Sequence, residues 1–424
     1  MAKLTEEELL FRKVEEKVKK AIFEYGLIVD GDRILIGLSG GKDSLALVQF
    51  AEAYRIDSTS VAVLATYSEF YNERRDYASS LNYTRRLFAS DEMPLDDKLA
   101  YFDRITGDRN FYSTFYLQIN DLATTLAMKY PHDPRVVKLY GDHLIASGQL
   151  DDALTYYKTH LDDLPPRIDY FNMVIDIESY KQRPDSVERY TSRAMKLFPE
   201  NVDLHLRKGQ MLSYAKRYDE ALKFYKNSLR LAPGDSLRGA VWGIIGETYH
   251  LMGQQALQKQ SEDRRPKASL YESRKGPAAR CMRKCYDAYD RSLALRYDNA
   301  MVLNNYAYFL SLEGRDLERA LAMAGRAIVL EENNPTYLDT YAWVLYRLGR
   351  YDEAKKTMQQ ALSLDRSQNP DLQLHYGDIL AALGEKFMAE VYWKKALEGG
   401  YDDPDAIVER FRRLKEAAQT PAAP

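Results

Sequence analysis

The stretch from Asn334 to Asp365 constrains the fold more than any other part of this sequence. Apolar and small residues recur at helical spacing along its first half and again along its second half, and Gly349 interrupts the pattern between them. Glycine suits the left-handed residue that ends a first helix. Ala342 in the first helix and Ala354 in the second are small enough to let the two helices approach closely. Such a pair cannot bury both of its faces alone, so the pattern predicts copies of itself as neighbours.

Copies of this pattern recur along the chain at a step of about 34 residues. Gly141 and Gly209, for example, stand 68 residues apart, which is two periods. The small residues inside the first helices are Gly141, Gly209, Gly246, Ala307, Ala342 and Gly377. In several copies an alanine follows twelve residues later in the second helix, at Ala153, Ala221, Ala354 and Ala389. Prolines at 165, 199 and 233 close successive units at the same step.

The offsets of these small and aromatic residues resemble the tetratricopeptide repeat, a helix–turn–helix unit. The clearest matches are VVKLYGDHLIASGQLDDALTYYKTHLDDLP, LHLRKGQMLSYAKRYDEALKFYKNSLRLAP and LHYGDILAALGEKFMAEVYWKKALEGG. The resemblance covers roughly residues 55 to 400, and it implies an all-α superhelix, or solenoid, of about nine units. It also implies a scaffold for protein–protein interaction, which holds an extended peptide or helix of a partner protein in its concave groove. The units in NNYAYFLSLEGRDLERALAMAGRAI and NPTYLDTYAWVLYRLGRYDEA look like those of bacterial tetratricopeptide proteins, many of which are exported or envelope-associated.

The first 50 residues carry a different feature, the hexapeptide SGGKDS. Residues 5–25 have the pattern of an amphipathic helix, residues 33–38 (RILIGL) that of a short buried strand, and residues 45–50 that of a helix start. The hexapeptide lies between the strand and the second helix. Its glycines let backbone N–H groups face a phosphate, the helix N-terminus adds partial positive charge, and Lys42 adds a full one. The spacing of a Walker A loop is absent.

The segment KVEEKVKKAIFEYGLIVDGDRILIGLSGGKDSLALV resembles the PP-loop ATP pyrophosphatases, and the tRNA 2-thiocytidine synthetases in particular. That resemblance implies that ATP, with magnesium, would be held through its phosphates. The residues it assigns to this contact are Ser39, Gly40, Gly41, Lys42, Asp43 and Ser44. An ATP-dependent, adenylating and tRNA-thiolating enzyme is therefore the alternative function, with tRNA as its partner. A third hypothesis is a scaffold regulated by nucleotide bound at this loop.

The resemblance to the PP-loop family ends near residue 50. A nucleotide-binding sheet needs several parallel strands covered on both faces, and here one strand is followed at once by repeat-like sequence. The thiocytidine family also carries CxxC pairs, whereas this chain has only Cys281 and Cys285, spaced CxxxC. We therefore interpret residues 1–50 as a truncated or fused α/β fragment, favour a chain that is not an enzyme, and assign no catalytic residue and no required cofactor.

The sequence divides into three parts: the fragment 1–50, the repeat array 51–400, and a capping helix with tail at 401–424. In the unit at 94–131, Gly107 supplies the turn, and Pro184 starts the second helix of a later unit, where a missing N–H costs least. Residues 254–280 form a polar insertion with an excess of Lys and Arg. An insertion inside a repeat predicts a loop. This loop is either a solvated connection or a basic contact for an acidic partner.

Few side chains point to chemistry. The six histidines include no pair four residues apart and no HExxH, so we expect no metal site. Cys281 and Cys285 make a poor zinc site by themselves, and small buried side chains are their expected role. Asn304 and Asn305 lie on a first helix, where their amides are candidates to bind a peptide backbone.

Composition excludes some partners. A net charge of −3 gives no general attraction to nucleic acid or membranes, and no apolar run approaches the roughly 18 residues of a membrane span. The N-terminus is charged throughout and lacks the apolar core of a signal peptide. The expectation is a cytoplasmic protein with a protein or peptide partner. If residues 1–50 replaced an original N-terminus, an envelope-associated protein is expected instead.

Overall fold

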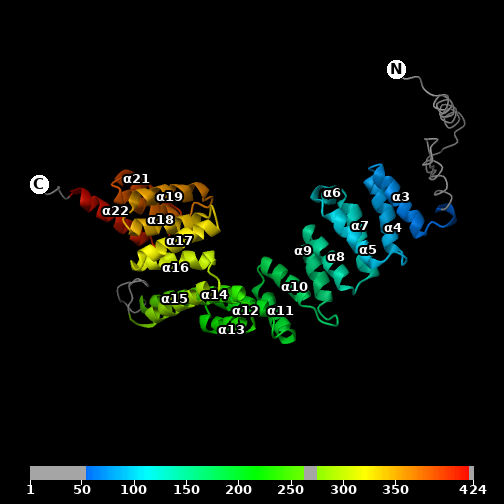
Figure 1. Ribbon diagram of the computed structural model, residues 1–424, viewed down its shortest axis with the longest axis horizontal. Helices are drawn as coiled ribbons and strands as arrows, with labels where there is room; N and C mark the ends of the chain where they lie inside the picture. Colours follow the sequence, from blue (N-terminus) through cyan, green and yellow to red (C-terminus); the bar gives the residue numbers. More distant parts are fainter. Residues whose placement is uncertain (1–53, 262–274, 420–424) are drawn as a thin grey trace, which may run out of the picture. The chain divides into compact units, whose positions relative to one another are not determined.

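The computed structural model describes residues 54–261 and 275–419, and helix is the regular secondary structure found in these ranges (Figure 1). This confirms the all-α prediction for the repeat region. The predicted α/β fragment at 1–50 lies outside the described residues. The chain divides into two compact units, residues 1–187 and residues 188–424, called unit 1 and unit 2 below. The boundary falls within helix α11 (Pro184–Leu197), which begins at Pro184 as predicted.

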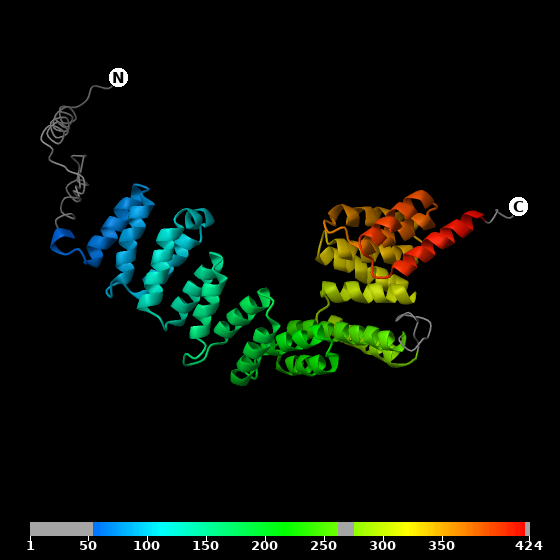
Figure 2. The same cartoon turned by 180° about the vertical axis from the view of Figure 1, so that it is seen from behind.

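Each predicted repeat between residues 57 and 400 contains a first and a second helix in chain order, and the succession can be followed from behind in Figure 2. Before α11, unit 1 contains α3 (Val61–Glu73), α4 (Tyr77–Ala89), α5 (Leu95–Thr106), α6 (Arg109–Thr114), α7 (Tyr116–Lys129), α8 (Pro134–Ala146), α9 (Leu150–Thr159) and α10 (Ile168–Tyr180). After α11, unit 2 contains α12 (Val202–Tyr214), α13 (Tyr218–Leu231), α14 (Asp235–Ser261), α15 (Pro277–Leu295), α16 (Ala300–Glu313), α17 (Leu317–Leu330), α18 (Pro335–Arg347), α19 (Tyr351–Leu364), α20 (Pro370–Ala382), α21 (Lys386–Glu398) and α22 (Pro404–Gln419).

The predicted small residues of the first helices pack directly against large side chains of the second helices. A Cβ atom on Gly141 would lie 2.3 Å from the ring of Tyr157, and one on Gly209 would lie 2.3 Å from the ring of Tyr225. Both aromatic rings are almost fully buried. In these repeats the glycine is therefore required because a ring occupies the space that any side chain would need.

Where the first helix carries alanine instead of glycine, the second helix carries methionine instead of an aromatic residue. Ala342 and Met358 stand sixteen residues apart, as Gly209 and Tyr225 do, and both are fully buried. Ala307 and Met323 repeat the arrangement. A larger residue on one helix is thus matched by a smaller or more flexible one on the other, as close packing of an interior requires.

The turn within a repeat needs a left-handed residue, as predicted from Gly349. Its φ is +77°, and the N–H of Arg350 bonds back to the carbonyl of Leu345 at 2.9 Å. Lys216 takes the same conformation at the corresponding turn, with a φ of +57°. The turn geometry is therefore retained even where the sequence lacks the glycine that would accommodate it without strain.

The prediction of a loop over residues 254–280 is wrong for residues 254–261 and 277–280, which are helical. Helix α14 continues to Ser261, and α15 begins at Pro277 after Gly276, whose φ is +99°. The reason is packing, since Ala256 and Leu257 lie against the buried cluster formed mainly by α15, α16 and α17. Residues 262–274 lie outside the described residues.

The unit at 94–131 contains a short helix, α6, that was not predicted. The predicted second helix is present as α7, and Gly107 ends α5. The Asp108 carboxylate then caps α6 by accepting hydrogen bonds from the N–H groups of Asn110 at 2.8 Å and Phe111 at 3.1 Å. This Asp cap is a local start signal that the repeat-based interpretation overlooked.

The predicted final helix is present as α22, and a bidentate ion pair joins it to α20. Arg410 donates from Nε to one Asp378 carboxylate oxygen at 2.7 Å and from a terminal nitrogen to the other at 2.8 Å.

In the described ranges, no helix combines the length and the apolar character needed to cross a membrane.

Candidate binding site

Two pockets flank α5 in unit 1. One, called the α3–α5 pocket, has a volume of about 630 Å³ and is lined by Ser68, Glu69 and Asn72 of α3, by Tyr101, Arg104 and Ile105 of α5, and by residues of α4 and α6. The other, called the α5–α8 pocket, has a volume of about 1130 Å³ and is lined by Phe102, Asp103 and Thr106 of α5 and by Arg135, Lys138 and His143 of α8. Opposite faces of α5 therefore contribute to the two pockets.

The short helix α6 is shared by both pockets. Asp108 and Phe111 border the α3–α5 pocket, whereas Arg109 and Tyr112 border the α5–α8 pocket. In the neighbouring repeats, a turn of a few residues connects the first helix directly to the second. The extra helix in this one repeat therefore supplies part of the wall of each pocket.

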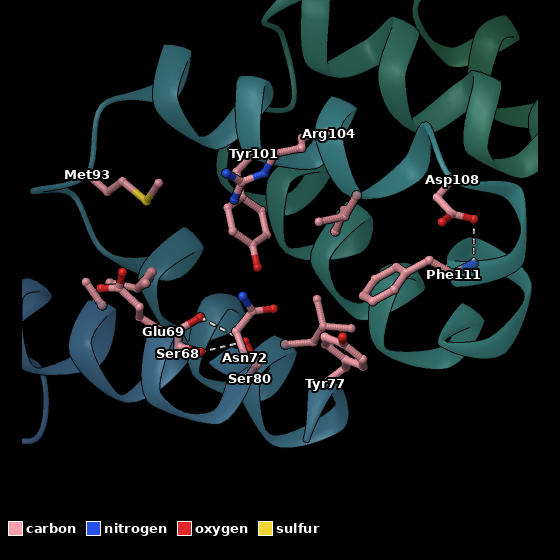
Figure 3. A pocket seen from close by; sticks show the side chains of 14 residues that line it. Ser68, Glu69, Asn72, Tyr77, Ser80, Met93, Tyr101, Arg104, Asp108 and Phe111 are labelled. Carbon is pink, nitrogen blue, oxygen red and sulfur yellow. Dashed lines mark hydrogen bonds between the residues drawn. The ribbon is translucent and has the colours of Figure 1, made fainter. Parts of the chain in front are cut away.

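Three hydroxyl groups that line the α3–α5 pocket, those of Ser68, Ser80 and Tyr101, belong to a hydrogen-bond network that includes Thr84 behind them. Ser68 and Thr84 oxygens are 2.8 Å apart, Ser68 and Ser80 oxygens are 3.2 Å apart, and Thr84 donates to the Tyr101 hydroxyl at 3.3 Å. Figure 3 shows Asn72 and the Tyr101 ring directed into the pocket. Because these hydroxyl groups already bond to one another, a ligand would be bound mainly by the other groups of the lining and by the Tyr101 ring.

Those groups combine an aromatic surface with charge. The Arg104 guanidinium carbon lies 4.9 Å from the centre of the Tyr101 ring, while Glu69 and Asn72 are exposed on the facing helix α3. Phe111 and Ile105 add apolar surface. Tyrosine and arginine are enriched at the centres of protein interfaces, and asparagine can both donate to and accept from a peptide group.

The α5–α8 pocket carries charges of both signs, and two of its cations, Arg135 and Lys138, are paired. Arg135 bonds to Asp133 and Asp96, and Lys138 forms an ion pair with Asp142. Such neutralised cations are poorly suited to nucleic acid, whose binding depends on Lys and Arg contacts with phosphates. They are better suited to a polypeptide of mixed polarity.

The floor of the α5–α8 pocket is formed in part by a buried histidine. His143 Nδ1 lies 2.9 Å from the Tyr112 hydroxyl, and its Nε2 lies 3.1 Å from the side-chain oxygen of Asn120. Burial lowers the pKa of His143, so the ring is neutral at pH 7. With both nitrogens engaged, His143 shapes the pocket and is not positioned to transfer a proton to a ligand.

The residues singled out from the sequence lie elsewhere. Ser39, Gly40, Gly41, Lys42, Asp43 and Ser44 lie outside the described residues, so their role in ATP binding stays a prediction. Asn304 and Asn305 lie on α16, where the Asn304 amide donates to the Asn305 oxygen at 3.1 Å and the Asn305 amide donates to Glu247 at 3.3 Å. Neither lines the pockets beside α5, and their binding of a peptide stays a prediction.

The expected role of the cysteines as small packed side chains is confirmed for Cys285, which is fully buried on α15, whereas Cys281 is half-buried. Burial raises the pKa of both thiols, which keeps them protonated and poor as nucleophiles at neutral pH.

The sequence interpretation missed both pockets. A usable signal was present, because Tyr101, Arg104 and Asp108 stand three and four residues apart and so share one side of the predicted helix and the turn after it. The repeat pattern obscured this signal, since it treated the segment only as an irregular copy.

A buried ionic pair joins two first helices of unit 2. His375 Nδ1 on α20 lies 2.8 Å from an Asp339 carboxylate oxygen on α18, and the ring stacks on Trp343 with 4.1 Å between centroids. Burial alone would lower the pKa of His375. The carboxylate of Asp339, with smaller effects from Asp378 and Asp371, raises that pKa above its usual value near 6.5.

This pair predicts a pH-dependent stability of unit 2. Because the folded-state pKa of His375 exceeds the unfolded one, its contribution is full below about pH 6.5 and is lost as pH rises through the folded-state pKa. The urea concentration at the unfolding midpoint should therefore decrease as the pH is raised from about 6 to about 9 in the parent chain. The decrease should be smaller in His375→Gln. Far-UV circular dichroism measures the unfolding. An identical pH dependence of the midpoint in both chains would contradict a stabilising role of the His375–Asp339 pair.

Family models described as tetratricopeptide repeat match residues 182–236 and 335–367. Among solved structures, a tetratricopeptide repeat protein from Parabacteroides merdae is similar over 66% of this chain and 97% of its own, with 14% identity and a TM-score of 0.44. The Cut9 and Hcn1 hetero-tetramer structure of the APC/C is similar over 94% of this chain and 81% of the other, with 12% identity and a TM-score of 0.47.

Curated relatives match a short N-terminal part of the chain. The tRNA-cytidine(32) 2-sulfurtransferase of Geotalea daltonii is 49% identical over 49 residues, which are 12% of this chain and 19% of the relative. The protein of the same name from Pelobacter propionicus is 39% identical over 89 residues, covering 18% of this chain and 33% of the relative. The chain thus spans between a fifth and a third of the length of these two relatives.

Proposed function

We propose that this chain, which carries tetratricopeptide repeats, is an interaction scaffold that binds an extended segment of a partner protein along the two pockets flanking α5. The observation that supports this most directly is the placement of both pockets against one first helix, on opposite faces of it. A single extended segment that crosses α5 would contact both. The partner is a protein or peptide, as expected from the sequence.

The lining of the pockets indicates what each would accept. The α3–α5 pocket combines Tyr101, Phe111 and Ile105 with Arg104, which suits an apolar or aromatic anchor beside a carboxylate or peptide carbonyl. Its volume of about 630 Å³ lies within the ~300–1000 Å³ range of pockets for drug-sized ligands, so it can hold a few side chains. The α5–α8 pocket, with its paired charges, suits a more polar continuation of the same segment.

Two matched arginines allow a test. The full chain is panned against a random peptide library, and the affinity of the selected peptides is measured by fluorescence anisotropy. Arg104→Ala, in the α3–α5 pocket, should weaken binding by about tenfold, which corresponds to 1.4 kcal/mol. Arg85→Ala removes an arginine of α4 that is also exposed but does not line either pocket, and it should leave affinity unchanged. Equal affinities for both variants would exclude the α3–α5 pocket as the binding site.

A second candidate function rests on sequence identity at the N-terminus. The match to 2-sulfurtransferases supports Ser39, Gly40, Gly41, Lys42, Asp43 and Ser44 as contacts for ATP phosphates, with tRNA as a partner under this alternative. Residues 54–261 and 275–419 contribute helices and no strand, so they do not extend the single strand predicted before this loop into a parallel sheet. We therefore favour the scaffold and not the enzyme. The cytoplasmic location stays a prediction.

Limited proteolysis with and without ATP and magnesium, analysed by mass spectrometry, tests this alternative. We expect the same cleavage pattern in the first 53 residues with and without nucleotide, because the match spans only 19% of the Geotalea daltonii relative. Protection by ATP in the parent chain that disappears in Lys42→Ala would show that the loop binds nucleotide. The adenylated substrate would then be the next question.

A further inference from the structure

Three potential metal ligands meet at one end of unit 1. His132 lies in the turn between α7 and α8, while His160 and Asp163 follow the end of α9. One ligand atom from each lies within 4.8 Å of the other two. His132 Nδ1 is 3.7 Å from an Asp163 carboxylate oxygen, and the two imidazole centroids are 6.3 Å apart. No metal site was expected from the sequence, because no two histidines stand four residues apart and HExxH is absent.

The hydrogen bonds of His160 hold its ring in place beside the other two ligands. Its Nδ1 lies 2.8 Å from the carbonyl oxygen of Tyr156, and its Nε2 lies 2.9 Å from the carbonyl oxygen of Pro131. A neutral imidazole has one N–H, so it can donate to only one of these carbonyls. With the proton on Nε2, that nitrogen donates to Pro131 and Nδ1 can accept from the Thr159 hydroxyl, whose oxygen lies 3.2 Å away. With the proton on Nδ1, the lone pair of Nε2 is available to a metal ion.

Metal binding through Nε2 requires the tautomer that carries its proton on Nδ1. Tyr156 lies four residues before His160 on α9, so a bond from Nδ1–H to its carbonyl closes naturally at the helix end. That bond leaves the lone pair of Nε2 toward Pro131, on the side of His132. Metal-bound histidines typically donate their other N–H to a backbone carbonyl or carboxylate, and this arrangement has the same form.

We propose that His132, His160 and Asp163 bind a divalent first-row transition-metal ion, with zinc as the best-fitting occupant. Two imidazoles and a carboxylate are ligands that zinc accepts at about 2.0–2.2 Å, which places neighbouring ligand atoms roughly 3.3 Å apart. The cluster must therefore contract. His132 can move to do so because its side chain is 78% exposed, whereas His160 is held by its buried contacts. The Pro131 carbonyl and water would complete the coordination.

Metal at this position would join the two ends of one helix pair, α8 and α9. It would link the turn that leads into α8 with the end of α9, close to the helix that lines the α5–α8 pocket. Because a metal that binds only the folded state stabilises it, zinc should raise the thermal midpoint of unit 1. The site is independent of peptide binding, so either proposal can fail while the other stands.

Zinc titration of the full metal-free chain by isothermal calorimetry tests the site. We expect one zinc ion per chain and a higher thermal midpoint that the chelator EDTA reverses. His132→Ala and Asp163→Asn should each weaken binding by at least about tenfold, the scale on which even outer-shell partners act. Asp162→Asn changes the exposed neighbouring carboxylate outside the cluster and should bind zinc as the parent does.

Other results would overturn the proposal. Zinc binding that persists unchanged in His132→Ala and Asp163→Asn would place the ion at other side chains. Absence of zinc binding by the parent chain would show that these three side chains do not form a metal site. Circular dichroism of each variant checks that the chain is folded. His132→Ala should leave the fold intact because the His132 side chain is mostly exposed.

Discussion

Gly209→Ala is expected to lower the free energy of unfolding of unit 2 by about 2 kcal/mol, although alanine is the better helix former. In an open helix the change would stabilise by about 1 kcal/mol. Here the new Cβ would lie 2.3 Å from a ring carbon of Tyr225, closer than nonbonded carbon atoms approach. Overpacking of this kind costs about 1–3 kcal/mol or more, and Tyr225 is 1% exposed and has little room to move. Urea unfolding followed by far-UV circular dichroism measures the effect.

A second substitution identifies the cause. Adding Tyr225→Met to Gly209→Ala recreates the alanine–methionine combination found at Ala342 and Met358, and it should restore most of the lost stability. The two changes are therefore coupled, as expected for side chains in contact. Gly234→Ala is the control, because its Cβ would meet no atom within 4 Å, and it should change stability by less than about 0.5 kcal/mol. Additive effects of the two substitutions would contradict the packing explanation.

Arg410→Ala is expected to lower the stability of unit 2 by about 3 kcal/mol. Asp378 is 8% exposed, and its carboxylate accepts hydrogen bonds from Arg410 and, at 2.9 Å, from the indole N–H of Trp393. Removing the guanidinium leaves a buried charge with one neutral donor, and breaking such a pair typically costs about 3–5 kcal/mol. Because the pair joins α22 to α20, hydrogen exchange should become fastest in α22.

Arg413 supplies a matched control on the same helix. It also forms an ion pair, with Glu409 at 2.7 Å, but its side chain is 74% exposed. Solvent screens such pairs, so Arg413→Ala should change stability by less than about 1 kcal/mol. Arg410→Lys, which keeps the charge but loses the bidentate geometry, should fall between the two. Equal losses for Arg410→Ala and Arg413→Ala would show that burial of Asp378 does not govern the effect.

The sequence by itself determined the helical repeats of this protein, because their signals are local. Each of these signals acts within a few residues: the spacing of apolar residues, the left-handed turn at Gly349 and the proline that starts α11. They can therefore be recognised without information on distant contacts. Even the pairing of small and large side chains can be read from the sequence, because Gly209 and Tyr225 lie on consecutive helices and only sixteen residues apart. The reason for the pairing, however, comes from the tertiary structure, in which the Tyr225 ring packs directly against the backbone of Gly209.

Tertiary structure alone decided the candidate sites. The pockets beside α5 depend on helices from three repeats and on the short helix α6, and residues 254–261 are helical because Leu257 finds a buried cluster to pack against. His132 and Asp163 are 31 residues apart, and no local pattern relates them. They meet because α8 and α9 pair as the two helices of one repeat, which brings the turn before α8 beside the end of α9. Packing of helices brings together side chains from different turns, whereas the spacing of residues in the sequence predicts only which side chains are neighbours on one helix.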